Sequence, residues 1–550
     1  MKKLKLVMAL LLAIAMLGSA TACGQGGTAQ EATGSAPAVA TSAPAESTPE
    51  ATTEQSQDVF KDPVEISIAF WGIEAALAAE DQFVDDLEKK LNVTLKPFEI
   101  TWDDYVQKIQ LWAASAQLPD AFAIDAVGTQ NYRNWIDQGI VRALPTDLSQ
   151  YPTLAKYLDK PDISALVENG KLYTVPRSKF DSMYYCAHDR NVLYRWDLAQ
   201  KAGITKEPET WDEFKAMLKA IIQKDPEKKQ IGGLTAVNVK QIGGFFWLFS
   251  DPAATSDGSG SDYKWIKDDG KYVPAVLDTK YALPALQNVR EMYDQGLIDK
   301  DIALVKGQQG YDKFASGKAA ALLEVGYGNV NNLLLPRWKQ LYPDTSLTDA
   351  VKRVKYFPAA DGNKYYCTFK TYWSESYFSA TVDDKKMDRI MRMYDYLLQP
   401  DTKEFYRYGV KDVDYTKDGD KITLKTTNEE LLQKQPGAGT LGQLVEFDDQ
   451  YFYDPNNSAV DASIREAAVK DLEVAKSETR EPDYEVKLTY VSTPTKDKFT
   501  IFDHDFMLNI MMGNKPVEDM WNSLLKDYES KGLSKMIDEV NEKAKAMGLN

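Results

Sequence analysis

The feature that most constrains the fold of this chain is an alternation of predicted strands and helices near the start of its globular part. The predicted strands cover residues 64–70, 92–100 and 120–125, and stretches of helical character lie between them. This order is typical of a parallel α/β sheet. In such sheets ligands bind beyond the carboxyl ends of the strands, which is where Trp71 and Asp125 lie.

The stretch from Gly170 to Trp211 predicts a crossing of the chain between two lobes. One apolar run leads into Pro176 and a second ends at Tyr185, before a predicted helix at residues 191–201. We interpret the two runs as a strand leaving the first lobe and a strand entering the second. A second crossing is predicted near Pro358.

The length of the chain agrees with more than one core. At 550 residues it exceeds the size at which a single hydrophobic core keeps growing. The predicted first lobe covers residues 59–175 and 358–410. The predicted second lobe covers residues 176–357 and 411–550.

The chain is strongly acidic. Its formal net charge is -17, from 65 basic and 82 acidic residues, and it becomes -20 when three leader lysines are removed. Such a charge repels a phosphate backbone, so nucleic acid is not expected as a partner. An acidic surface also serves solubility outside the cell, and therefore does not by itself identify a ligand.

Residues 1–22 predict a signal peptide. A basic start precedes an apolar run that is short for a membrane span, and small residues follow it. The sequence Ala20-Thr-Ala-Cys23 resembles the bacterial lipobox, with alanine where leucine is usual. We predict that Cys23 is lipid-modified and anchors the protein to a membrane, and a plain cleaved signal is the alternative.

The stretch that follows predicts a flexible tether over residues 23–58. From Gly24 onward it has no aromatic and no basic residue, so it cannot bury enough apolar surface to fold. Its coil reach is on the order of 30 Å. Such a tether lets a globular body work close to a membrane complex.

Motifs for nucleophilic, phosphate or metal chemistry are not found. His188 and His504 stand in no zinc motif, and no nucleophile elbow or P-loop occurs. A calcium-loop pattern from Asp414 fails because Thr416 and Lys425 stand where acidic ligands are needed. A pair of carboxylates for glycoside hydrolysis stays an open alternative. With 82 acidic residues, some pairs occur by chance, so their presence in the sequence is uninformative. We expect no enzymatic activity, no cofactor and no metal site.

Only two cysteines remain once Cys23 is set aside. Cys186 and Cys367 could form a disulfide in an oxidising compartment or stay as two buried thiols. Sequence separation alone does not decide between these states.

Aromatic residues recur at predicted strand ends and favour a sugar-binding cleft. The aromatic residues are Trp71, Tyr327 and Trp373, joined by Asp125, Arg177, Lys179 and Asp181. Sugar rings stack their C–H faces on aromatic side chains, and their hydroxyls need polar partners. Trp373 is expected to be exposed because Ser374, Glu375 and Ser376 follow it, and glycines flank Tyr327. Ordinary packing is the alternative for each aromatic residue.

Trp247 is a further candidate ligand platform. It lies in the apolar and aromatic run at residues 243–249. A packed core helix is the alternative for this run.

Several short motifs occur in order along the chain. They are residues 170–176 (GKLYTVP), 189–198 (DRNVLYRWDL), 202–204 (AGI), 208–214 (PETWDEF) and 314–319 (FASGKA), and Met512-Gly513 before a final helix ending at Met547-Gly548. In this combination the chain resembles extracellular solute-binding protein family 1, the carbohydrate-binding lipoproteins of ABC importers, in the long branch common in Gram-positive bacteria.

The resemblance implies an α/β fold of the periplasmic-binding-protein-like type (type II), with two hinge-linked lobes and a ligand cleft between them. It implies a monomeric, non-enzymatic receptor, lipid-anchored on the extracellular face of the cell membrane, that captures a carbohydrate for the permease subunits of an ABC transporter. By position it assigns the ligand site to Trp71, Asp125, Arg177, Asp181, Tyr327 and Trp373. A ligand sensor for a signalling kinase and a secreted glycoside-acting enzyme are the alternatives.

The sequence departs from the family after Asp225-Pro226. Relatives tend to carry an Asp/Asn/Gly-rich loop there that looks metal-binding, and this chain has Glu227-Lys-Lys-Gln230 instead. The replacement puts a calcium ion at this loop in doubt.

Overall fold

The computed structural model describes residues 60–549 except for 80, 102, 181–190, 238–263, 307, 325, 360, 367–370, 447–453, 458, 482 and 502. Several predictions lie outside the described residues: the signal peptide, Cys23, the tether, Asp181, Trp247, and the pair Cys186 and Cys367. None of the helices in the described part combines the length and the apolar character needed to cross a membrane.

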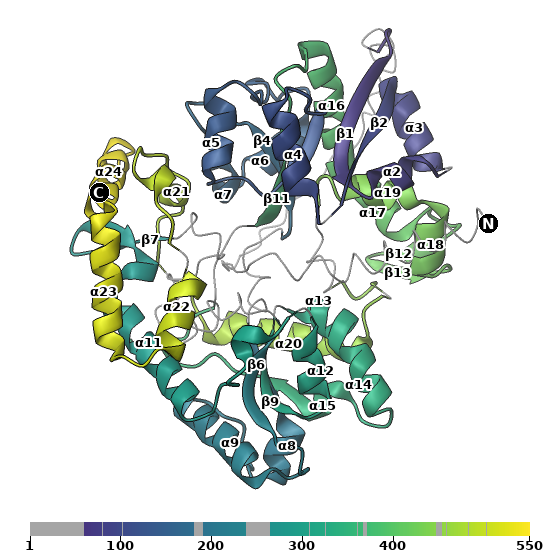
Figure 1. The fold of residues 1–550 in the computed structure, drawn as a ribbon. Coiled ribbons are helices and arrows are strands. Elements are labelled where there is room, and N and C mark those ends of the chain that lie inside the picture. Colours follow the sequence, from purple (N-terminus) through teal and green to yellow (C-terminus); the bar gives the residue numbers. More distant parts are fainter. Residues whose placement is uncertain are drawn as a thin grey trace, which may run out of the picture.

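The first lobe is built around a five-stranded sheet with the order β2-β1-β3-β11-β4 (Figure 1, top). Its strands are β1 (Val64–Trp71), β2 (Val93–Ile100), β3 (Ala121–Ile124), β4 (Thr174–Ser178) and β11 (Tyr372–Phe378). The parallel pairing of β1 with β2 and β3 confirms the predicted parallel sheet. β11 lies between β3 and β4 and runs antiparallel to both.

The second lobe contains a four-stranded sheet with the order β10-β5-β9-β6 (Figure 1, bottom). Its strands are β5 (Asn191–Arg195), β6 (Gly232–Ala236), β9 (Ala319–Glu324) and β10 (Val351–Arg353). Two small hairpins stand apart from both sheets: β7 (Trp265–Asp268) with β8 (Lys271–Pro274), and β12 (Tyr415–Asp418) with β13 (Lys421–Leu424).

The helix predicted over residues 191–201 is wrong in its first half. Residues 191–195 form β5, and the helix α8 covers only Trp196–Lys201. Val192, Leu193 and Tyr194 are all buried, because helices cover both faces of the sheet. A continuous apolar run of this kind has no period that separates a strand from a helix.

Helices surround the two sheets. In the first lobe they are α2 (Ile73–Leu77), α3 (Gln82–Leu91), α4 (Tyr105–Ala114), α5 (Gln130–Asp137), α6 (Pro152–Leu158), α7 (Pro161–Ser164), α16 (Asp384–Leu398), α17 (Pro400–Tyr408), α18 (Asn428–Lys434) and α19 (Pro436–Gly442). Beside the second sheet and toward the C-terminus they are α9 (Trp211–Lys224), α11 (Thr279–Asp294), α12 (Gln309–Ala315), α13 (Tyr327–Asn329), α14 (Leu335–Leu341), α15 (Leu347–Ala350), α20 (Ala462–Glu478), α21 (Val486–Thr489), α22 (Asp503–Met512), α23 (Val517–Ser530) and α24 (Leu533–Ala546). Shorter helical turns cover Ala275–Leu277, Ile302–Leu304, Val330–Leu334 and Lys496–Lys498.

Each sheet has its own hydrophobic core. One core surrounds the first sheet, and two cores lie on opposite faces of the second. Successive residues of β5 alternate between these two, since Val192 and Tyr194 join one and Leu193 joins the other. This alternation follows from the two-residue period of a strand.

The boundaries of the two lobes stay a prediction. The structure adds that residues after α19 run along the edge of the first sheet, where Ser178 N–H donates to the Val445 carbonyl at 2.7 Å. Ala438, Leu441 and Val445 belong to the core of the first sheet, although the predicted second lobe includes residues 411–550. The apolar face of α19 therefore buries itself against the first lobe.

Candidate functional site

Three of the predicted site residues, Trp71, Arg177 and Trp373, meet on the first sheet. Trp71 ends β1, Arg177 lies in β4 and Trp373 lies near the start of β11. The two indole rings have centroids 6.3 Å apart and planes inclined by 21°. The guanidinium carbon of Arg177 lies 5.4 Å from the Trp71 ring centroid and 5.5 Å from that of Trp373. The fold thus brings one cation and two aromatic rings together from three separate strands.

A β-bulge positions Trp373. The pairing of β11 with β4 shifts register between Tyr372 and Glu375, and Ser374 inside this bulge has a φ of 55°. Pro176 pairs opposite Glu375, and β4 tolerates this proline because it is the edge strand of the sheet. A bulge bends its strand and re-aims the side chains beside it.

The prediction that Trp373 is exposed is wrong, because the residue is only 7% exposed within β11. Glu375 in the same strand is fully buried. Its Oε2 accepts the N–H groups of Ala126 (3.1 Å) and Val127 (3.4 Å) and the hydroxyl of Tyr377 (2.8 Å). These three donors satisfy one oxygen of the buried carboxylate, which helps a polar residue to lie inside the sheet. In the sequence, Glu375 is an acidic residue within the aromatic-rich run of residues 372–378, and this pattern could have indicated its role.

Arg177 is buried, and the N–H groups of its guanidinium have defined hydrogen-bond acceptors. It is 1% exposed. Its Nε donates to the Gln443 carbonyl at 2.5 Å, and its Nη1 donates to the Ser374 hydroxyl at 2.8 Å. Burial lowers the pKa of the guanidinium to about 9, so Arg177 remains a cation at neutral pH. These contacts fix the plane of the guanidinium against the aromatic rings.

Asp125 lies at the same edge of the first sheet. It follows β3 directly, and its neighbour Ile124 pairs with Glu375 of β11. Its side chain is exposed to solvent. The carboxyl ends of β1 and β3 therefore place an exposed carboxylate at the same edge of the sheet as Trp71 and Trp373.

Tyr327 belongs to the second lobe and forms a different cluster. It begins α13 and is 6% exposed. The Arg353 guanidinium lies over its ring, 4.7 Å from the centroid, and its hydroxyl donates to Asp471 of α20. Arg353 also lies 3.9 Å from Asp471 as an ion pair. Arg353 and Asp471 were not predicted from the sequence, because no local pattern links residues so far apart.

The predicted site residues therefore form two groups, one on each lobe. Trp71, Arg177, Trp373 and Asp125 share the first sheet, and Tyr327 lies on the second lobe. In Figure 1, α13 and α20 lie at the side of the second lobe that faces the first. Asp181 and Trp247 lie outside the described residues, so their relation to the two groups stays a prediction.

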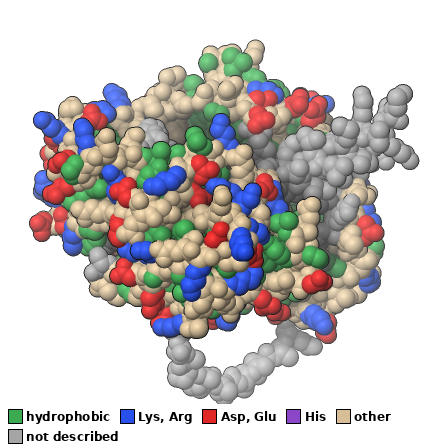
Figure 2. Space-filling view, turned by 60° about the horizontal axis from the view of Figure 1, so that its bottom comes forward, with side chains coloured by type: hydrophobic (Ala, Val, Ile, Leu, Met, Phe, Trp, Pro, Cys, Tyr) green, Lys and Arg blue, Asp and Glu red, His purple; other side chains and the backbone are tan. Residues whose placement is uncertain are grey.

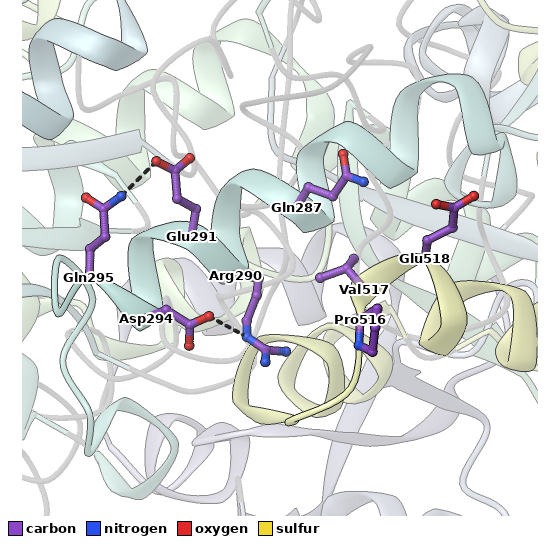
Figure 3. Close-up of a pocket in the computed structure, with 8 residues that line it drawn as sticks. All are labelled: Gln287, Arg290, Glu291, Asp294, Gln295, Pro516, Val517 and Glu518. Atoms are coloured by element: carbon purple, nitrogen blue, oxygen red, sulfur yellow. Dashed lines mark hydrogen bonds and ion pairs between the residues drawn. The ribbon is translucent and has the colours of Figure 1, made fainter.

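A surface depression between α11 and α23 is not a candidate site (Figure 3). Several of its polar side chains already pair with one another: Arg290 pairs with Asp294 at 2.8 Å, and Gln295 donates to Glu291 at 2.8 Å. No predicted site residue lies on either helix. Within the described part of the chain, no group of three or more His, Cys, Asp or Glu side chains could hold a metal ion.

Comparison with known sequences gives one family. The family model described as bacterial extracellular solute-binding protein matches residues 71–404. The chain is 24% identical over 378 residues to the lipoprotein LipO of Bacillus subtilis, covering 66% of this chain and 70% of that protein. It is also 24% identical over 381 residues to the polygalacturonan/rhamnogalacturonan-binding protein YtcQ of the same organism, covering 68% of this chain and 71% of that protein.

Comparison with solved structures confirms the predicted two-lobed α/β fold. The chain is similar to the ABC-transporter substrate-binding protein FusA of S. pneumoniae, solved as an EF-hand mutant in complex with fructo-nystose. The TM-score is 0.62 at 16% identity, with 88% of this chain and 99% of that chain covered. At this identity the likeness concerns the fold alone.

Proposed function

Because the chain belongs to the bacterial extracellular solute-binding proteins, we propose that it captures an oligosaccharide between its two lobes and delivers it to the permease of an ABC transporter. The observation that carries this proposal is the cluster of Trp71, Trp373 and Arg177 at the edge of the first sheet. The names of two relatives support the ligand class, since YtcQ is described as a polysaccharide-binding protein and FusA was solved with fructo-nystose.

In this proposal the two indoles form a stacking platform whose geometry Arg177 maintains. Trp71 and Trp373 are 8% and 7% exposed, so a sugar reaches only a small part of the two residues, while the buried guanidinium of Arg177 lies against them. Asp125 supplies an acceptor for sugar hydroxyls. Tyr327 contacts the ligand from the second lobe, and Asp181 and Trp247 complete the proposed site.

Ligand capture then shifts the protein toward a closed form. A ligand that contacts both lobes stabilises the closed state by the difference between its affinities for the closed and open states. Hinge closure around a ligand is a common switching motion, and a permease can distinguish the two forms. This role needs no chemical step on the sugar, so we propose a receptor and not an enzyme.

We also propose that Cys23 is lipid-modified and holds the protein on the extracellular face of the membrane. The support is the lipobox-like sequence before Cys23 and the description of the relative LipO as a lipoprotein. Metabolic labelling with a fatty acid tests this step. Loss of the label in Cys23→Ser is expected, and an unlabelled wild-type protein would contradict it.

A panel of oligosaccharides tests the proposed function. The purified protein is mixed with xylo-, malto-, manno-, fructo- and pectin-derived oligosaccharides, and tryptophan fluorescence, calorimetry and product formation are followed together. Binding without turnover is expected for at least one sugar. Products that accumulate in proportion to the protein would show an enzyme instead.

Conservative tryptophan variants test the site. Trp71→Phe and Trp373→Phe keep an aromatic ring but reduce the stacking area, so the affinity for the bound sugar should fall about fivefold. The matched control is Trp338→Phe, which changes a buried tryptophan with an arginine, Arg195, 4.9 Å from its ring centroid in the second lobe. Equal affinities in all three variants would reject this location of the site.

A further inference from the structure

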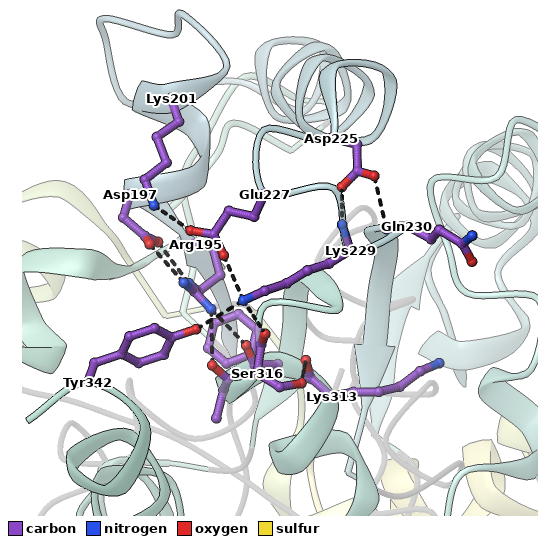
Figure 4. Close-up of polar contacts among 12 residues, drawn as sticks. Arg195, Asp197, Lys201, Asp225, Glu227, Lys229, Gln230, Lys313, Ser316 and Tyr342 are labelled. Atoms are coloured by element: carbon purple, nitrogen blue, oxygen red, sulfur yellow. Dashed lines mark hydrogen bonds and ion pairs between the residues drawn. The ribbon is translucent and has the colours of Figure 1, made fainter.

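The loop after α9 is closed by its own aspartate (Figure 4). Asp225 follows the last residue of the helix and has a left-handed backbone, with a φ of 37°. Its Oδ1 accepts the backbone N–H of Lys229 at 2.9 Å, and its Oδ2 accepts that of Gln230 at 3.0 Å. Both oxygens of this carboxylate are therefore occupied by the loop itself.

The second carboxylate of the loop lies between two ammonium groups. Lys229 Nζ lies 2.7 Å from one oxygen of Glu227, and Lys201 at the end of α8 pairs with the other. The Glu227 side chain is 17% exposed, so these pairs are partly shielded from water. Burial alone would raise the pKa of the Glu227 carboxyl, but the two ammonium groups lower it to about 2.

Lys229 also joins this loop to the end of another helix. Its Nζ donates to the Ser316 carbonyl, just after α12, at 2.9 Å. Arg195 donates to the preceding carbonyls of Phe314 (3.1 Å) and Ala315 (3.2 Å). Cations are favourable at this end of a helix because its last carbonyls have no partner within the helix.

Gly317 provides the space for these cations. It has a φ of +77°, and a Cβ there would lie 3.2 Å from Lys229 Nζ and 3.3 Å from Arg195 Nη1. The motif at residues 314–319 is not part of the proposed ligand site. Its backbone carbonyls accept hydrogen bonds from two basic side chains.

The residues of this loop do not fit a calcium ion. Calcium takes six to eight oxygen ligands, among which carboxylates are the strongest. All four carboxylate oxygens of Asp225 and Glu227 already accept N–H donors, and the Ser316 carbonyl accepts from Lys229. A divalent cation would have to displace two ammonium groups of the same sign.

We propose that the Lys229 ammonium is a built-in cation that holds this loop against the end of α12, so that the second lobe folds without a divalent metal ion. A cation supplied by the chain is always present and does not vary with the calcium concentration outside the cell. FusA, by contrast, is described with an EF-hand, which is a calcium-binding loop. The inference concerns stability and does not depend on sugar binding.

Thermal unfolding of the purified protein in millimolar calcium and in excess EGTA tests this inference. The unfolding midpoint of the wild-type protein is expected to be the same in both. A midpoint that falls in EGTA would overturn the inference.

Variants of neighbouring lysines give the second arm of the test. Lys229→Met should lower the unfolding midpoint by roughly 2–4 °C in both buffers, the size of shift typical for loss of one interaction in a lobe of this size. The matched control is Lys228→Met, which removes the same charge from an exposed position of the same loop and should leave the midpoint unchanged. Equal midpoints in the two variants would overturn the inference.

A third variant keeps the test decisive if Lys229→Met does not fold. Glu227→Gln removes the charge between the two ammonium groups while keeping the shape of the side chain. It should lower the midpoint equally in calcium and in EGTA. A midpoint that matches the wild-type value in both buffers would overturn the inference.

Discussion

Two buried arginines show how a single residue can support either a site or a scaffold. Arg177 lies against Trp71 and Trp373 on the first sheet, and Arg195 lies against Trp338 on the second. Both are at most 1% exposed. Arg195 has a bidentate carboxylate partner in Asp197, with both contacts at 2.7 Å, and Arg177 donates to the Gln443 carbonyl and the Ser374 hydroxyl.

We therefore expect lysine substitution to have different effects at the two arginines. A lysine is a point charge and cannot keep a planar stack and two divergent hydrogen bonds. Arg177→Lys should therefore weaken binding of the sugar found in the panel by about tenfold, or 1.4 kcal/mol, as measured by calorimetry. Arg195→Lys should lower the unfolding midpoint and leave the sugar affinity unchanged. The reverse pattern would place the binding site on the second lobe.

The Glu227 carboxyl predicts a pH dependence of stability. Its pKa is about 2 in the folded protein against an ordinary value of 4.5, so folding favours its charged form. A carboxyl group whose pKa is lowered by folding stabilises the protein at pH values above 4.5. This stabilisation is lost as the pH falls toward about 2. The free energy of unfolding of the wild-type protein should thus exceed that of Glu227→Gln at neutral pH and converge with it in acid. Denaturant titrations at several pH values measure this gap, and a constant gap would contradict the assignment.

At the scale of elements, a helix approaches a strand closely enough to require glycine. Gly310 lies in α12, and a Cβ there would be 2.2 Å from the Ala236 carbonyl oxygen at the end of β6. No side-chain rotation can relieve a clash with backbone. The packing of α12 on the second sheet therefore depends on this residue.

Gly310→Ala should destabilise the second lobe by about 1–3 kcal/mol, the cost typical of an overpacked contact. Gly328→Ala is the control, because a Cβ at Gly328 would meet no described atom within 4 Å. Chemical denaturation of both variants compares them with the wild-type protein. A Gly310→Ala protein as stable as the control would show that α12 can shift away from β6 without loss.

The sequence predicted β1 from its alternation and β3 as a short buried run, but it did not predict β5. Alternation within β1 reflects buried Ile66 and Ile68 beside exposed Glu65, so its period of two was visible. β5 has no exposed face, so its apolar run was assigned to a helix. Trp373 was predicted to be exposed because polar residues follow it, and the N–H groups that donate to Glu375 belong to residues 249 and 248 positions away in the sequence.

The same limit applies to the candidate site. Strand-end positions predicted Trp71 and Trp373 individually, but the contact between them depends on the strand order. Arg177 reaches acceptors that lie 197 and 266 positions away in the sequence, and no local pattern indicates them. The partners of Tyr327, which lie on β10 and α20, were missed for this reason.

At the scale of the whole molecule, separate cores in the two lobes predict relative motion of the lobes. Among the described residues, the stretch at α21 passes between them, since Leu488 joins the core of the second lobe and Tyr490 joins that of the first. Domains joined by limited contacts move relative to one another by default. A sugar that contacts both Trp71 and Tyr327 would couple this motion to binding.

Closure on a ligand therefore predicts a measurable compaction. The radius of gyration from small-angle X-ray scattering should fall when a binding oligosaccharide from the panel is added at saturation, because the proposed site has one part on each lobe. A non-binding sugar from the same panel, at the same concentration, is the control for solvent contrast. Trp373→Phe should shift the compaction to higher sugar concentration without changing its amplitude, since it weakens binding on the first lobe but leaves the hinge intact. A bound protein with the radius of the free protein would mean that the ligand sits on one lobe only, and the proposed contribution of Tyr327 would then be wrong.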